Sequence, residues 1–252
     1  MSEIATRLWW IRHAPVDHGG RIYGQQDLSC DCSEAANFSG LAEQLPRAAV
    51  WVTSNLRRTH QTAAAIIRAG LPGPERIPGP EAIAIDDLAE QHFGQWQGLA
   101  HEDLDQLSAG DFHRFWHAPA HEAAPGGESF LAVIERVSRA VNRLVETYAG
   151  RDVIAVAHGG TIRAALALAL DLAPEAALAF TIENCSVTRI DHIDGPGMGH
   201  GWRVVTVNRP PRCSVGDPAR STTRRTMLAN VHGARKISHC RQAASASRSP
   251  GP

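Results

Sequence analysis

The chain has 252 residues, of which 43% are hydrophobic and 20% charged, enough for one large globular domain or two small ones. Its net charge of −1 hides a division: residues 209–252 carry +8, with one acidic residue (Asp217), and the other 208 residues carry −9. Five scattered cysteines, an odd number, exclude a secreted disulfide framework, and the longest apolar run, seven residues at 164–170, is too short to span a membrane. We therefore expect a cytoplasmic protein with no membrane association.

Short apolar runs alternate with longer helical patterns over residues 1–208, which is typical of an α/β domain with crossover helices. In chain order we expect a strand at 8–11, a strand at 48–53, a helix at 56–69, a helix at 129–148, a strand at 152–157, a helix at 161–170, and strands at 186–190 and 202–207. Ser54 is the predicted N-cap of the first helix. The last two strands are predicted to form a hairpin.

Residues 209–252 have few large apolar residues and no periodicity. Such a segment cannot bury enough surface to offset its ordering entropy, so we expect a basic, disordered C-terminal tail. A basic tail also suggests nucleic-acid binding, but this one lacks aromatic residues for stacking on bases, and the acidic body would oppose a polyanion. We expect no specific nucleic-acid partner.

Two predicted strands end in a histidine followed by a small residue, in Arg12-His13-Ala14 and in His158-Gly159-Gly160. Ligands of parallel sheets bind outside the carboxyl ends of the strands, so these two histidines are expected to share one pocket. Small residues let backbone N–H groups approach an anion, and a helix beginning near Thr161 would point its positive end there. A single histidine after a strand is more often a surface or capping residue, but a matched pair favours a site.

Two further stretches carry polar residues suited to a site. The stretch Ser54-x-Leu56-x-Arg58 again lies where a strand passes into a helix, and Arg57 and Arg58 point about 100° apart around that helix, so only one of them can face a pocket. Glu90 lies in Leu88-x-Glu90-x-x-x-Gly94-x-x-x-Gly98 among apolar and aromatic residues, surroundings that favour a proton-donating carboxyl group.

Together these motifs resemble the histidine phosphatase superfamily over residues 7–208. The resemblance implies a phosphoglycerate mutase-like fold, a three-layer αβα sandwich with a mostly parallel central sheet. It also implies a metal-independent phosphoric monoester hydrolase of the histidine acid phosphatase type, which needs no cofactor and acts on a small phosphorylated substrate.

The roles that the resemblance implies fall on residues of each motif. His13 would attack phosphorus and become a phosphohistidine, and Glu90 would protonate the leaving alkoxide and then activate water. Arg12 and Arg58 would clamp the phosphoryl oxygens, His158 would be a further donor to them, and Gly159 would add its backbone N–H.

The departures from the family's pattern concern the walls of the pocket. Ala14 and Val16 replace the family's usual Gly and Thr, and Arg21 fits a family stretch in which Gln25 replaces a Trp; we expect Arg21 and Gln25 to bind substrate. The short segment between Gly98 and Gly127 favours a phosphatase over a mutase, because an open pocket admits water. Within that branch the sequence resembles the α-ribazole phosphatases of cobalamin biosynthesis.

Several alternatives stay open at this point. The substrate is α-ribazole 5′-phosphate or a sugar phosphate, the activity is hydrolysis or mutase-type phosphoryl transfer, and a non-catalytic phosphate-recognition module is a third reading. A homodimer is one of the assembly states that the sequence allows. Arg163 is either an ion-pair partner or a direct participant in the site.

Other candidate ligand groups are weaker. His113, His117 and His121 recur every four residues, but Pro119 interrupts their helix and no carboxylate or thiol completes a zinc set, so we expect no metal. Cys30 and Cys32 are interpreted as two loop thiols.

Overall fold

The structure, a computed structural model, describes residues 4–74, 82–101, 103–104 and 116–211. Its strands form one six-stranded sheet in the order β3-β2-β4-β1-β5-β6. The strands are β1 (Ile4–Arg12), β2 (Val50–Thr53), β3 (Ile83–Ala84), β4 (Asp152–Ala157), β5 (Val187–Asp194) and β6 (Trp202–Arg209). The pairs from β3 to β1 are parallel, and β5 and β6 are antiparallel additions. The predicted mostly parallel sheet and its closing hairpin are confirmed.

The helices are α1 (Ala35–Gln44), α2 (Arg57–Arg68), α4 (Phe130–Thr147), α5 (Gly159–Leu170) and the single turn α6 (Pro174–Ala177). Helices α2, α4 and α5 lie close to the three predicted helices, whereas α1 and α6 were not predicted. Helix α4 begins after Ser129, whose hydroxyl accepts a hydrogen bond from the N–H of Ala132, an N-cap that the sequence analysis placed inside the helix. Among the described residues, no helix is long and apolar enough to cross a membrane.

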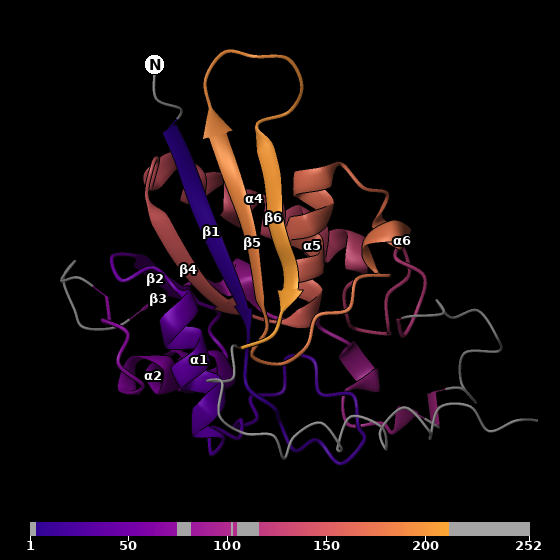
Figure 1. Cartoon of the computed structure of the whole chain (residues 1–252). Helices are drawn as coiled ribbons and strands as arrows, with labels where there is room; N and C mark the ends of the chain where they lie inside the picture. The colour runs from indigo at the N-terminus through magenta and orange to yellow at the C-terminus, as the bar shows by residue number, and fades with distance from the viewer. Residues whose placement is uncertain (1–3, 75–81, 102, 105–115, 212–252) are drawn as a thin grey trace, which may run out of the picture. The chain divides into compact units, whose positions relative to one another are not determined.

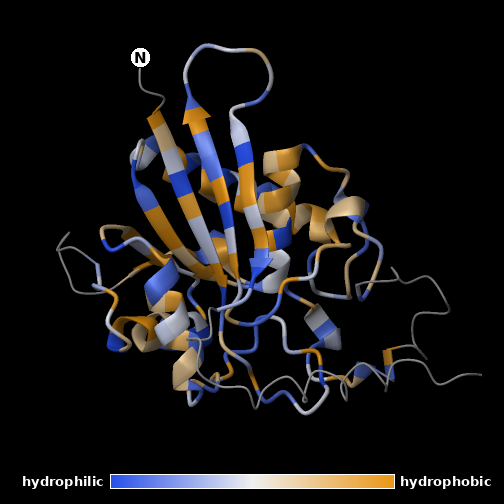
Figure 2. Ribbon diagram, in the orientation of Figure 1, coloured by the Kyte–Doolittle hydropathy of each residue, from blue (hydrophilic) through white to orange (hydrophobic). Residues whose placement is uncertain are grey.

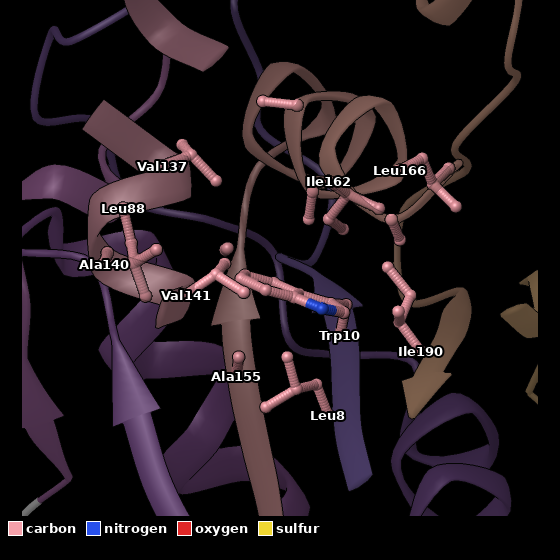
Figure 3. Packing of buried hydrophobic residues seen from close by; sticks show 14 of the residues in the cluster. Leu8, Trp10, Leu88, Val137, Ala140, Val141, Ala155, Ile162, Leu166 and Ile190 are labelled. Carbon is pink, nitrogen blue, oxygen red and sulfur yellow. The ribbon is translucent and has the colours of Figure 1, made fainter. Parts of the chain in front are cut away.

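The alternation of side chains along β1 explains why helices cover both faces of the sheet. Leu8 and Trp10 are fully buried and belong to the cluster formed with α4, α5 and α6, whereas Ile11 packs with the residues of α1 and α2 on the other face. Figure 3 shows the ring of Trp10 among side chains from α4 and α5. The predicted three-layer αβα sandwich is therefore confirmed, and in Figure 1 α1 and α2 stand apart from the group of α4, α5 and α6.

Most residues of helix α5 are apolar, as its colouring in Figure 2 shows, and most of them are buried. It follows β4 directly, and β4 pairs with β1 in a register that sets Ala157 beside Arg12. The N–H of His13 donates to the carbonyl of Ala157 at 3.0 Å. The two strand ends that carry the predicted histidines are thus neighbours, and the N-terminus of α5 begins between them.

The hairpin ends one residue beyond the predicted domain boundary, since β6 extends to Arg209 and pairs there with Val187. Most of the predicted tail, from residue 212 onward, lies outside the described residues. Its disorder therefore stays a prediction.

Candidate active site

His13 stands at the end of β1, and its side chain is 1% exposed. Its Nδ1 lies 2.7 Å from the carbonyl oxygen of Ala14. A carbonyl only accepts hydrogen bonds, so Nδ1 carries the proton and the neutral ring keeps its lone pair on Nε2. The carbonyl of His13 itself accepts from the side-chain amide of Asn184 at 2.8 Å. These bonds at both ends of the residue fix the ring with its nucleophilic nitrogen free.

The residue after His13 is held by α2. The N–H of Ala14 donates to the hydroxyl of Thr62 at 2.9 Å, and that hydroxyl donates to the carbonyl of Arg58 at 2.7 Å. Ala14 is buried and does not have a positive φ, so the backbone does not require the glycine of the family's motif at this position.

Two arginines flank the histidine. Arg58 is fully buried, and its Nη atoms donate to the carbonyls of Gly24 and Gln26 at 2.6 and 2.9 Å. Arg57 instead forms an exposed ion pair with Asp27, which confirms that only one of the two adjacent arginines faces inward. Arg12 donates from Nη1 to the carbonyl of Ile182 at 2.6 Å, while its Nε is a buried donor without a partner among the described residues. An unsatisfied buried guanidinium donor beside His13 suits an anion.

His158 caps the N-terminus of α5, and its ring lies 5.2 Å from that of His13 between ring centroids. Its Nδ1 accepts from Nε of Arg58 at 3.2 Å, because a guanidinium can only donate. The proton of the neutral ring is then on Nε2, which donates to the hydroxyl of Ser54 at 2.8 Å. In this arrangement His158 orients Arg58 through Nδ1 and is itself held by Ser54 through Nε2; its direct donation to a phosphoryl group stays a prediction.

Ser54 does not have the role predicted for it. The residue before α2 is Leu56, which has no side-chain cap. Ser54 is buried two residues earlier, where its hydroxyl accepts from the N–H of Leu56 and bonds to His158. The serine that was predicted to cap α2 therefore holds the ring of His158 instead.

Both histidines are surrounded by features that disfavour a positive charge. Burial, followed by the charges of Arg58 and Arg12, lowers the pKa of His13 well below its usual value near 6.5. Burial and the charge of Arg58 lower the pKa of His158 in the same way. Both rings are therefore neutral at pH 7, the form in which imidazole is a nucleophile.

We expect nuclear magnetic resonance of the free, ¹⁵N-histidine-labelled protein to show His13 as a neutral ring protonated on Nδ1 at pH values where an ordinary histidine is already charged, because protonation would place a buried cation beside two arginines. Replacing Arg58 by Met should move its titration toward higher pH. A His13 ring that titrates at or above pH 6.5, or that carries its proton on Nε2, would contradict this description.

Glu90 reaches the N-terminus of α5 from the segment after the 3₁₀ turn Asp86–Leu88. One carboxylate oxygen accepts from the N–H of Gly160 at 3.1 Å and from that of Gln91 at 2.9 Å. A side chain at position 160 would collide with this carboxylate, so glycine is required there by close approach. The main-chain carbonyl of Glu90 accepts from the side-chain amide of Gln25. Gln25, predicted to bind substrate, thus uses its amide to hold the Glu90 segment.

The segment that carries Glu90 is also clamped from α4. Arg136 donates to the carbonyls of Asp87, Ala89 and Glu90 at 2.7 to 3.0 Å and forms two hydrogen bonds to the carboxylate of Glu128. Both members of this ion pair are largely buried, with 12% and 20% of their side chains exposed. Arg136 was not identified from the sequence, where it stands in a long amphipathic helix.

We expect replacing Arg136 by Met to lower the free energy of unfolding by about 2–4 kcal/mol, because a largely buried carboxylate and three carbonyls lose their donors. Arg143 offers a matched control two helical turns further along the same face: its ion pair with Asp87 is exposed, so Arg143→Met should cost less than about 1 kcal/mol. Urea unfolding of both variants measures the difference. Equal losses would show that Arg136 does not hold the segment.

Arg12 and Glu90 line an open cavity of about 230 Å³. Its walls also include His18, Arg21, Ile22, Tyr23, Gly24, Phe93, His101, Trp116, His117, Gly159 and Arg163. The three arginines of this lining suit an anionic metabolite, and its aromatic side chains offer apolar contacts.

The sequence matches the family described as Histidine phosphatase superfamily (branch 1) over residues 8–209. The chain belongs to this superfamily. Over 182 residues it is 34% identical to the glucosyl-3-phosphoglycerate phosphatase of Mycobacterium tuberculosis, a match that covers 67% of this chain and 77% of that protein. A solved structure described as a mycobacterial hydrolase superimposes with a TM-score of 0.69 at 29% identity, covering 84% of this chain and 94% of the other.

Not every relative has the same extent. The chain is 35% identical over 173 residues to a bifunctional protein of Mycobacterium tuberculosis, but the match covers 66% of this chain and 44% of that protein. The chain therefore spans less than half the length of that relative. A solved structure of a putative α-ribazole-5′-phosphate phosphatase from Escherichia coli is 24% identical, with a TM-score of 0.63, which shows a shared fold alone.

In this member of the superfamily the structure brings most of the predicted site residues together. Arg12, Glu90 and Gly159 line the cavity, with His13 and His158 buried beside them. Arg21 also lines it, although its side chain is exposed and donates to the carbonyl of Gly98.

Arg163 lies on the wall of this cavity, and its Nε donates to the carbonyl of Phe180. Its guanidinium group stacks on the ring of Trp116, 4.7 Å from the centroid. Burial lowers its pKa to about 10, so it stays charged at neutral pH. The sequence analysis considered an ion pair for Arg163. The contacts that the structure gives its guanidinium group are instead the carbonyl of Phe180 and the ring of Trp116.

Tyr23 was missed from the sequence. Its ring meets that of His13 edge to face with centroids 6.3 Å apart, and the guanidinium of Arg58 lies 5.1 Å above the Tyr23 ring. A tyrosine in a loop carries no signal of such contacts, since they join residues far apart in the chain.

The structure describes two of the three histidines that were considered as zinc ligands. His113 lies outside the described residues. His117 stacks on His101 in the cavity wall with ring centroids 5.1 Å apart, whereas His121 is exposed and lies near Glu175. Among the described residues, no three histidines, cysteines or carboxylates are grouped as metal ligands.

Proposed function

We propose that the chain is a metal-independent phosphomonoesterase that transfers the phosphoryl group of a small metabolite to His13 and then to water. The observation that carries the proposal is the state of His13: a buried, neutral ring with Nδ1 committed to the carbonyl of Ala14 and Nε2 free. Such a ring is an oriented nucleophile at neutral pH.

The charges around His13 suit the transferred group. Phosphoryl transfer needs mainly positioning and compensation of negative charge. Arg12 offers an unpaired Nε donor, Arg58 is locked in place by two carbonyls and His158, and Gly159 stands at the positive end of α5. These three residues would hold the non-bridging oxygens while Nε2 of His13 attacks.

Glu90 would serve the leaving group and then the water. Its carboxyl group lies at the cavity wall, held by the N–H of Gly160, and both are at the same end of α5 as Gly159. A proton given to the departing alkoxide restores the alcohol, and the resulting carboxylate can take a proton from the water that attacks the phosphohistidine. A phosphate-recognition module would be expected to lack one of the four motif side chains. All four are present, namely His13, Arg58, Glu90 and His158, which favours an enzyme.

The substrate is proposed as a class. A cavity of about 230 Å³ admits a phosphorylated sugar or an acid of similar size. Relatives named glucosyl-3-phosphoglycerate phosphatase add a glycosylated phosphoglycerate to the candidates, alongside sugar phosphates and α-ribazole 5′-phosphate.

The proposal is tested with a panel of phosphomonoesters assayed for released phosphate in the presence of a chelator. The panel contains glucosyl-3-phosphoglycerate, 3-phosphoglycerate, fructose bisphosphates and α-ribazole 5′-phosphate. We expect hydrolysis of at least one member, unchanged by the chelator. Isomerisation of 3-phosphoglycerate without phosphate release, activity that disappears with the chelator, or no turnover of any member would contradict the proposal.

A further inference from the structure

A pair of thiols lies against the first turns of α2, the helix that carries Arg58 and Thr62. Cys30 and Cys32 belong to a stretch without helix or strand that precedes α1, and their sulfur atoms are 3.6 Å apart. Both residues are half-buried, so a small oxidant can reach them. Two sulfurs in contact on an irregular backbone need only a small local movement to bond, because no helix or strand hydrogen bonds have to break.

Cys30 is joined to the residues that position the nucleophile. Its sulfur lies 3.3 Å from the carbonyl oxygen of Arg58, to which its S–H donates, and 3.6 Å from the hydroxyl of Thr62. That hydroxyl accepts the N–H of Ala14, the residue after His13. The N–H of Cys30 in turn donates to the side-chain carbonyl of Gln61. A change at Cys30 therefore acts on the start of α2 and on the turn after β1 together.

We propose that Cys30 and Cys32 form a reversible disulfide that lowers the activity of the adjacent site, with a peroxide as oxidant and a dithiol as reductant. The effect of the disulfide on activity rests on the proposed phosphatase function, whereas the formation of the disulfide does not. Within cells that keep thiols reduced, disulfides of this kind are transient and redox-sensing.

The reaction balances with either thiol as the first to react; with Cys30 first, it takes two steps. The thiolate of Cys30 attacks a peroxide oxygen, the O–O bond breaks, and a sulfenic acid and one water are formed. The sulfur of Cys32 then attacks the sulfur of Cys30, the S–S bond forms, and the hydroxyl group leaves with the Cys32 proton as a second water. The pair loses two electrons, and hydrogen peroxide is reduced to two waters.

A third cysteine is the competing partner. Cys185 packs in the same cluster but is buried, and burial raises its pKa to about 12. Its S–H is out of reach of a dissolved peroxide, whereas Cys30 and Cys32 are half-buried, and this difference in access disfavours Cys185 as a reacting thiol. Oxidation takes the S–H donor away from the carbonyl of Arg58 and draws the Cys30 sulfur from Thr62 toward Cys32. A ring closed over three residues is short, and such strained disulfides are readily reduced.

The test treats the full chain with hydrogen peroxide, blocks free thiols, and maps disulfides by peptide mass spectrometry while phosphate release is assayed in parallel. We expect the peptide with both cysteines to lose two hydrogens, kcat/KM to fall about three- to tenfold, and dithiothreitol to restore both. The affinity for inorganic phosphate, measured on the same samples, reports the state of the site independently of turnover.

Cys32→Ser is the matched variant, because it keeps Cys30 and lies outside the catalytic groups; its basal activity should be unchanged and the reversible loss abolished. Cys185→Ser should respond as the unaltered chain does. Pairing of Cys30 with Cys185, Cys213 or Cys240, a disulfide that leaves activity and phosphate affinity unchanged, or a Cys32→Ser variant that still loses activity reversibly would overturn the proposal. Absence of phosphatase activity with the disulfide still formed would instead refute the proposed function.

Discussion

Replacing His13 by Ala is expected to lower kcat/KM for every phosphomonoester by at least about 10⁴-fold, because the variant has no atom that can accept the phosphoryl group. The residual rate would come from the charges of Arg12 and Arg58 acting on water, a pathway without a covalent intermediate. Phosphate release measured under substrate-limited conditions gives the ratio.

The loss must be separated from unfolding. The buried side chain of His13 bonds to the carbonyl of the next residue, and its bonds to Ala157 and Asn184 are made by the main chain, so circular dichroism and thermal unfolding should show an intact fold. His121 is a matched control, since its side chain is 72% exposed; His121→Ala should keep full activity. Retention of more than about a tenth of the activity in His13→Ala would mean that another group carries the reaction.

The second large effect is expected at Glu90, and it depends on the leaving group. Replacing Glu90 by Gln keeps a side-chain oxygen for the N–H of Gly160 but removes the transferable proton. We expect kcat/KM for an alkyl phosphate to fall by about 10²–10⁴-fold, the usual worth of general acid catalysis. For p-nitrophenyl phosphate the fall should be less than about tenfold, because nitrophenolate departs without a proton.

The parameter kcat/KM is the one to compare, since it reports the steps up to the first irreversible one, here formation of the phosphohistidine. The later attack of water also uses Glu90, so kcat should fall for both substrates. Equal losses of kcat/KM for the two substrates would show that Glu90 acts by position or charge and does not donate a proton.

The sequence was most informative where a short pattern dictates the outcome. The predicted strand 152–157, apolar after Asp152, corresponds residue for residue to β4, and the helix that follows starts two residues before its predicted start. The placement of His13 and His158 at neighbouring strand ends followed from the rule that parallel strands expose their carboxyl ends at one edge. Helical geometry predicted that only one of Arg57 and Arg58 faces inward, and the family resemblance selected Arg58, which the structure buries while Arg57 is exposed.

What the sequence could not supply are contacts between distant segments. The clamp of Arg136 on the Glu90 segment joins residues 46 positions apart, and the bond from Ser54 to His158 joins residues 104 apart. Ser54 also shows how a correct local signal can mislead, because a serine before a helix is usually a cap. Its hydroxyl is instead drawn to the imidazole that the fold brings beside it.

The central claim is that a phosphoryl group is carried on Nε2 of His13, and trapping the intermediate tests it most directly. The protein is mixed with ³²P-labelled substrate, quenched within the first turnovers in alkaline denaturant, and digested for mass spectrometry. Since Nδ1 is committed to the carbonyl of Ala14, we predict an acid-labile, alkali-stable label on the Nε2 nitrogen of His13. A label on another side chain would contradict it, as would steady turnover of labelled p-nitrophenyl phosphate by Glu90→Gln, in which dephosphorylation is the slowed step, without any labelled protein.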